Sequence, residues 1–97
     1  MAYQLSDFIR EANDIFSEIE KELLNRKKGI RGDGTIQQLE FIRDELEQIK
    51  NFAFTNNLPP KECRYTAFSR YVVDEWDVKS ILGQRLCELA DKFKRKL

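Results

Sequence analysis

The first group of side chains that could do chemistry is a set of carboxylates near the start of the chain. They recur at steps of three and four residues, which aligns them along one flank of a helix. Aligned carboxylates could hold metal ions or attract a basic partner by charge. A di-metal site in a helical bundle also uses Glu-x-x-His motifs, but the chain has no histidine. The pattern therefore predicts a solvated face or an acidic docking stripe made of Glu11, Asp14, Glu18 and Glu22.

The second group is a run of aromatic and basic residues between positions 64 and 76. Tyrosine, tryptophan and arginine are enriched at binding hot spots. Interleaved with cations, aromatic rings could also stack on single-stranded bases. The alternative is structural, with the rings buried to hold a long connection against the bundle. We expect a candidate partner surface formed by Arg64, Tyr65, Phe68, Arg70, Tyr71 and Trp76.

Small residues form a third pattern near the C-terminus. Gly83, Cys87 and Ala90 recur at helical spacing beside the expected core face. A glycine inside a helix costs about 1 kcal/mol relative to alanine, so a compensating contact is expected. Close approach of a second helix would supply that contact, either within the bundle or across a homodimer.

The chain offers no recognisable catalytic apparatus. Without histidine it lacks the commonest general base, the commonest metal ligand and the usual partner of a nucleophilic serine or cysteine. Its two cysteines, Cys63 and Cys87, are too few for a disulfide scaffold, and reduced thiols are the simpler interpretation. We predict that the protein is not an enzyme and uses no cofactor.

Three long helices are expected to position these groups. Apolar residues recur every three or four positions over residues 6–28, 35–56 and 77–96. Thr35 and Gln38 form the T-x-x-Q pattern of a capping box, Gly29 can end the first helix, and Asn56 can end the second. In the last segment Val78, Leu82, Leu86, Leu89 and Phe93 share one face.

Residues 59–74 are ambiguous. Pro59 and Pro60 suit a helix start, whereas β-branched and aromatic residues such as Thr66 and Val72 suit an extended chain. A short helical or irregular fourth element is expected here. The fold class is then all-α, an up-and-down bundle forming a single domain over residues 1–97.

Composition limits the possible partners. The chain has 17 basic and 17 acidic residues, so its formal net charge is zero and nucleic-acid binding is disfavoured. It has no apolar run of the roughly 20 residues that span a bilayer, and its N-terminus lacks the features of a secretory signal. We therefore expect a cytoplasmic protein, a monomer or homodimer, without a membrane partner.

Three functions remain open. The first is a non-enzymatic protein-interaction module, such as an inhibitor, adaptor or immunity-type protein. The second is a nucleic-acid-associated regulator that uses residues 64–76 and the basic C-terminal turn. The third is a purely structural or oligomerisation role.

Overall fold

Four α-helices and one 3₁₀ turn follow one another along the chain. The computed structural model describes residues 3–97, apart from the side chains of Tyr71 and Val73. The elements are α1 (Leu5–Lys27), α2 (Ile36–Phe54), η1 (Lys61–Cys63), α3 (Phe68–Glu75) and α4 (Ile81–Arg95). No strand occurs among the described residues. The all-α prediction is confirmed.

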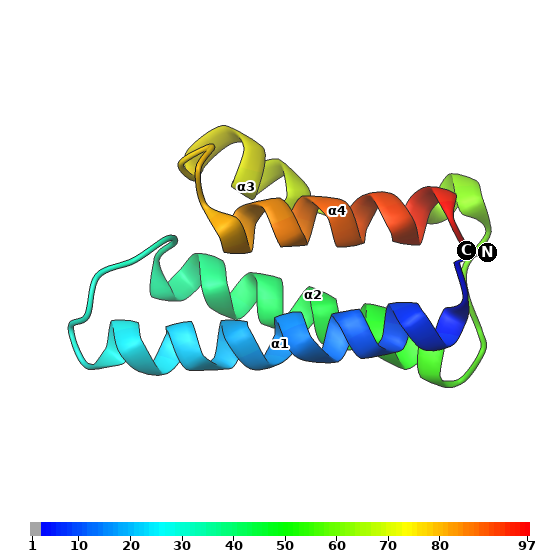
Figure 1. Cartoon of the computed structure of the whole chain (residues 1–97), viewed down its shortest axis with the longest axis horizontal. Helices are drawn as coiled ribbons and strands as arrows, with labels where there is room; N and C mark the ends of the chain where they lie inside the picture. Colours follow the sequence, from blue (N-terminus) through cyan, green and yellow to red (C-terminus); the bar gives the residue numbers. More distant parts are fainter. Residues whose placement is uncertain (1–2) are drawn as a thin grey trace.

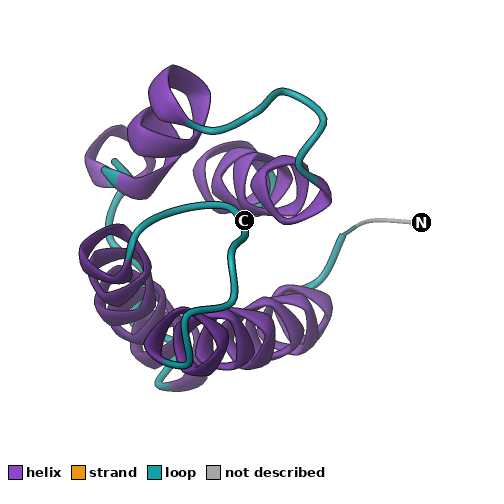
Figure 2. Ribbon diagram, turned by 90° about the vertical axis from the view of Figure 1, so that its left-hand side faces the viewer, coloured by secondary structure: helices purple, strands orange, loops and turns teal. Residues whose placement is uncertain are grey.

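The helices run up and down along the long axis of the molecule (Figure 1). Each α-helix packs against two others: α1 against α2 and α4, and α3 against α2 and α4. Seen along the bundle, they surround a common core (Figure 2). Because α3 is the shortest α-helix, it covers only one end of the side opposite α1.

The helix ends follow local hydrogen bonding. Thr35 caps α2 by accepting a bond from the Gln38 amide at 3.1 Å, and the Gln38 side chain bonds back to the Thr35 amide. Gly29 follows α1 at φ +82°, and Asn56 follows α2 at φ +51°. Both therefore adopt the left-handed conformation that commonly ends a helix. The first helix begins one residue earlier than expected, because Gln4 and Asp7 form its capping box.

The last helix begins later than its apolar pattern predicts. Residues 77–80 form a turn in which the Asp77 side chain accepts a bond from the Lys79 amide at 2.9 Å. Ser80 then caps α4 by accepting a bond from the Gly83 amide at 3.0 Å. Val78, expected on the core face of this helix, is instead 84% exposed. The serine cap fixes the start of α4, and the hydrophobic spacing that includes Val78 is coincidental.

The ambiguous segment contains both of the expected forms. Residues 61–63 make the 3₁₀ turn, residues 64–67 are irregular, and α3 then begins at Phe68. Phe68 and Val72 from α3 are buried with the apolar faces of the three long helices. Aromatic and β-branched side chains of this segment, such as Phe68 and Val72, thus lie on a short helix and complete the core.

Candidate binding cleft between α3 and α4

A carboxylate from α2 holds the start of α3. Ala67, the residue at the N-cap position, has no side chain that can cap the helix. Instead, the two carboxylate oxygens of Glu45 accept bonds from the amides of Ala67 at 2.9 Å and Phe68 at 2.7 Å. A negative charge at a helix N-terminus also interacts favourably with the helix dipole. Glu45 was not singled out from the sequence, because capping by a residue 22 positions away leaves no local motif.

Removing this cap should weaken the docking of α3. We expect Glu45→Ala to lower the free energy of unfolding by roughly 1–2 kcal/mol, as other lost caps do. Urea unfolding of the variant measures the change. Glu47→Ala is the matched control, because Glu47 is an exposed carboxylate of the same helix. Equal losses in the two variants would contradict the assignment of Glu45 as a cap.

Trp76 anchors the other end of α3. Its ring is 7% exposed, and its indole N–H donates to the Gln38 side chain at 3.3 Å. The ring also lies against Gly34, where an added Cβ would be 2.6 Å from ring atom Cζ2. Gln38 further bonds to Glu75, the last residue of α3. Both ends of α3 are thus fixed to α2 and to the turn that precedes it.

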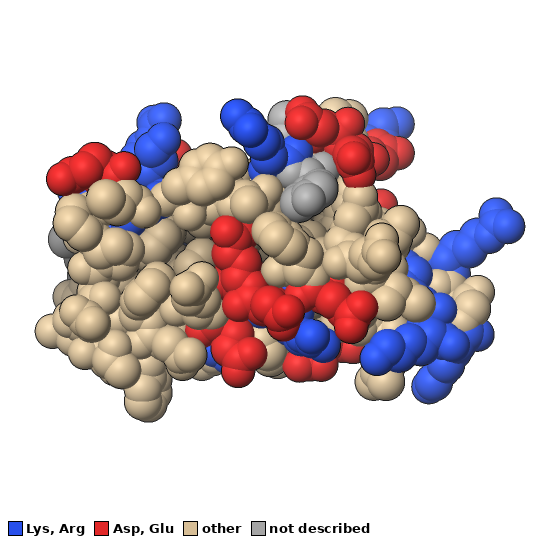
Figure 3. Space-filling model, turned by 180° about the vertical axis from the view of Figure 1, so that it is seen from behind, with Lys and Arg blue, Asp and Glu red and all other residues tan. Residues whose placement is uncertain are grey.

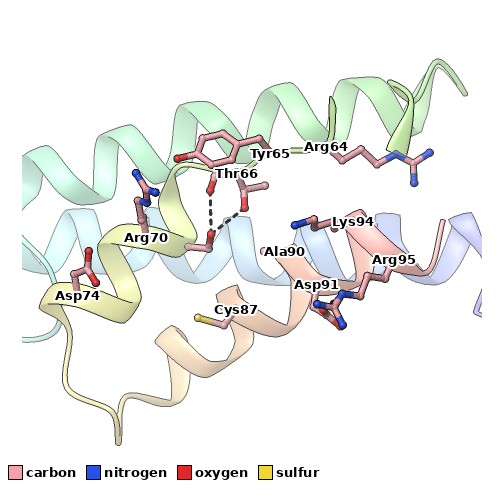
Figure 4. Close-up of a pocket in the computed structure, with 11 residues that line it drawn as sticks. Arg64, Tyr65, Thr66, Arg70, Asp74, Cys87, Ala90, Asp91, Lys94 and Arg95 are labelled. Atoms are coloured by element: carbon pink, nitrogen blue, oxygen red, sulfur yellow. Dashed lines mark hydrogen bonds and ion pairs between the residues drawn. The ribbon is translucent and has the colours of Figure 1, made fainter. Parts of the chain in front are cut away.

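Between α3 and α4 the surface is hollowed into a cleft of about 420 Å³. One wall comes from residues 64–66 and α3, and the other from the C-terminal half of α4 (Figure 4). Its charged lining consists of four cations and two carboxylates, namely Arg64, Arg70, Lys94, Arg95, Asp74 and Asp91. We call this hollow the α3–α4 cleft. Its lining has a basic surplus although the whole chain has none.

Arg64 has a structural role within the cleft wall. Its side chain is buried and donates to the carbonyl oxygens of Pro59 at 2.8 Å and Phe93 at 3.1 Å. The guanidinium also lies 5.7 Å from the centre of the Phe93 ring. The Phe93 carbonyl belongs to the last turn of α4, where a cation is favoured by the helix dipole. Arg64 therefore ties the irregular segment to the end of α4.

The remaining cations differ in their partners. Arg95 pairs with Asp91 at 3.1 Å. Arg70 and Lys94 are exposed, and neither side chain has an ion-pair or hydrogen-bond partner among the described residues. Two available cations therefore lie on opposite walls of the same cleft.

Small side chains of α4 leave space for the cleft. Cys87 and Ala90 line it from α4 (Figure 4). Nearer the start of that helix, Gly83 approaches α3 so closely that an added Cβ would lie 3.1 Å from Cγ1 of Val72. Close helix contact thus occurs within the bundle at Gly83, whereas Cys87 and Ala90 face a hollow. Burial, with a further contribution from Glu88, raises the pKa of the Cys87 thiol, so this group is protonated at neutral pH.

The candidate partner surface divides between the core and the exterior. Phe68 and Trp76 belong to the buried core, and Arg64 is buried as well. Tyr65 is 66% exposed and lines the cleft together with Arg70. Tyr71 lies outside the described side chains. Burial therefore accounts for Phe68 and Trp76, and among the described side chains of the run Tyr65 and Arg70 remain exposed for recognition.

The candidate acidic docking stripe runs along the junction of α1 with α4. Glu11 pairs with Lys92 at 2.9 Å and Glu18 with Arg85 at 3.1 Å, both across the helix interface. Glu22 lies 3.5 Å from Arg26 on its own helix. Asp14 is exposed. Cations thus pair with three of the four carboxylates, and two of these ion pairs join α1 to α4.

Acidic side chains also gather on the opposite face of the molecule. Figure 3 shows them over the middle of α2, with basic side chains at the end where α1 turns into α2. Three carboxylates of this helix, Glu40, Asp44 and Glu47, recur at steps of three and four residues, and Asp44 forms an ion pair with Arg43 at 3.1 Å. The basic cleft and this acidic face give the neutral chain two regions of opposite charge.

Glu11 should make stability depend on acid pH. Burial acts to raise its pKa, but the bonds from Tyr3 and Lys92 outweigh burial, so the pKa lies below its usual value of 4.5. The ionised form therefore stabilises the fold above about pH 4.5, and this contribution is lost as the pH falls through the folded-state pKa. We expect Glu11→Gln to be less stable than the wild type at pH 7, with the difference shrinking by pH 3. Urea unfolding at both pH values measures it, and a difference that does not change with pH would contradict this account.

Other site chemistries receive no support from the described part of the chain. No group of three or more Cys, Asp or Glu side chains there could hold a metal ion. None of the helices described is both long and apolar enough to cross a bilayer. No protein-family model matches the sequence, and no curated protein is significantly similar to it.

Proposed function

We propose that the protein is a non-enzymatic interaction module that binds another protein through the α3–α4 cleft. The observation that carries the proposal is a pair of cations on the two walls of one cleft, Arg70 and Lys94, for which the described residues supply no ion-pair or hydrogen-bond partner. Two other cations of α4, Lys92 and Arg85, are by contrast paired with carboxylates of α1. Exposed Tyr65 adds an amphipathic ring of the kind enriched at interfaces.

A rigid module of this kind would work by occupying a surface of its partner, as an inhibitor, adaptor or immunity-type protein does. The anchoring of α3 at both ends supports such a role, because a fixed cleft loses little conformational freedom on binding. The tight contact of Gly83 with Val72 accounts for the glycine within one copy of the chain. One of the three small residues that suggested a homodimer contact is thus accounted for within the bundle.

Nucleic-acid binding is the second candidate, favoured by the same basic surplus. Two features weigh against it. Single-stranded nucleic acids are bound by aromatic rings on which bases stack, but Phe68 and Trp76 are buried. A phosphate backbone would also pass Asp74 and Asp91, whose charges repel it.

Differential capture from a lysate of the source cells tests the proposal. The bait is the full chain, compared with a double variant carrying Arg70→Glu and Lys94→Glu. The control bait carries Lys21→Glu and Lys27→Glu, which change the net charge equally at exposed positions of α1. Circular dichroism verifies that all three baits are folded.

We expect a captured protein whose recovery falls about tenfold or more with the cleft variant and is unchanged with the control. Recovery that does not depend on the cleft cations would overturn the proposal. Capture that disappears when the lysate is treated with nuclease would overturn it in favour of the nucleic-acid alternative.

A further inference from the structure

A second hollow continues the α3–α4 cleft toward the start of α4. It measures about 200 Å³ and is lined by Val72, Trp76, Val78 and Gly83. Cys87 lines both hollows, so they meet at this residue. The second hollow lacks the cations of the first and is bordered mainly by apolar atoms of the α3–α4 turn. We call the two adjoining hollows together the groove, with a basic half and an apolar half.

Val78 shows that the apolar half is open to a ligand. It is 84% exposed, the highest exposure of any large apolar side chain described. The turn of residues 77–80 holds it at the surface, because Ser80 rather than Asp77 begins the helix. An apolar side chain entering beside Val78 would remove surface of both partners from water. Such burial contributes about 25 cal/mol for each Å².

Resting on the proposed function, we infer that the groove binds a short acidic segment of a partner protein that carries an apolar side chain next to its carboxylates. The carboxylates pair with Arg70 and Lys94 in the basic half. The apolar side chain enters the hollow beside Val78. Charge complementarity with the basic half favours the carboxylates of the segment, and the apolar lining favours its apolar side chain.

The arrangement of charge around the groove favours a short segment over a long polyanion. Asp74 and Asp91 lie within the lining of the basic half, and Asp77 lies at the edge of the apolar half. A uniformly charged chain running along the groove would meet these carboxylates in turn. A segment that places an apolar side chain near Asp77 avoids that repulsion.

Fluorescence anisotropy with synthetic peptides tests the inference on the full-length protein. The probes are labelled decapeptides of Gly and Ser: one carries Glu-Glu-Leu near its middle, one has Ser in place of that Leu, and one has Lys in place of both acids. A labelled ten-nucleotide deoxythymidine strand is the fourth probe. We expect the acidic peptide with Leu to bind about 5–20-fold more tightly than the Ser peptide, and the Lys peptide not to bind.

Two variants locate each half of the groove. Lys94→Ala should weaken both acidic peptides. Val78→Asp should abolish the preference for Leu over Ser. Ile81→Asp is its matched control, because Ile81 is 75% exposed and does not line the hollow. It should leave the preference intact.

Equal binding of the Leu and Ser peptides, a preference that survives Val78→Asp, or tighter binding of the nucleotide strand would each overturn the inference. Failure here is distinguishable from failure of the proposed function. A lysate protein whose capture still depends on Arg70 and Lys94 would keep the cleft as the contact surface while removing this description of its occupant.

Discussion

Replacing Phe68 by alanine is expected to lower the free energy of unfolding by about 3–5 kcal/mol, which is the usual cost of truncating a buried phenylalanine. Phe68 is fully buried and is the first residue of α3. Its ring carries that helix into the core formed by the three long helices. For a domain of this size the loss is a large fraction of the total stability. Chemical unfolding followed by circular dichroism measures it.

Tyr65→Ala is the matched control for this prediction. Tyr65 is an aromatic residue of the same segment but is 66% exposed, so its removal should change stability by less than about 0.5 kcal/mol. If Phe68→Ala proved as mild as Tyr65→Ala, the packing of α3 against the core would be wrong. The wall of the α3–α4 cleft would then be wrong with it.

Gly34→Ala is the second large expected effect, at about 2–4 kcal/mol of lost stability. Gly34 adopts φ +81°, which strains a residue with a side chain. The new Cβ would also lie 2.6 Å from the Trp76 ring. That ring is held by the core and by Gln38, so it must shift to make room. Thermal or urea unfolding measures the loss.

Gly29→Ala separates the two causes. Gly29 has a nearly identical φ of +82°, but an added Cβ would meet no atom within 4 Å. This variant should therefore show only the conformational cost of about 1–2 kcal/mol. Equal losses at Gly29 and Gly34 would contradict the close contact between the α1–α2 turn and Trp76.

Much of the fold could be predicted because the relevant signals are local. The capping box of Thr35 with Gln38, the glycine after α1 and the spacing of apolar residues all act over a few positions. The same reasoning failed at Val78, where helical spacing extended one turn beyond the true helix start. Ser80, a good capping residue directly before the apolar run, was the signal that could have corrected it.

The cleft could not be predicted in the same way because its parts are distant in sequence. Arg70 and Lys94 are 24 positions apart, and only the packing of α3 on α4 brings them to one hollow. Residue type alone also could not separate buried Phe68 and Trp76 from exposed Tyr65. The pairing of Glu11 and Glu18 with α4 likewise depends on which helix α1 contacts.

The most direct test of the central claim uses a thiol as a reporter of cleft occupancy. Cys87 lines both halves of the groove, and neither Cys87 nor Cys63 forms a disulfide. In a Cys63→Ser variant, the rate of Cys87 modification by an uncharged maleimide is measured with and without a saturating concentration of the acidic Leu peptide. A Cys87→Ser variant, which leaves exposed Cys63, serves as the control. We predict that the peptide slows modification of Cys87 severalfold and leaves Cys63 unaffected, whereas an unchanged Cys87 rate would contradict binding in the α3–α4 cleft.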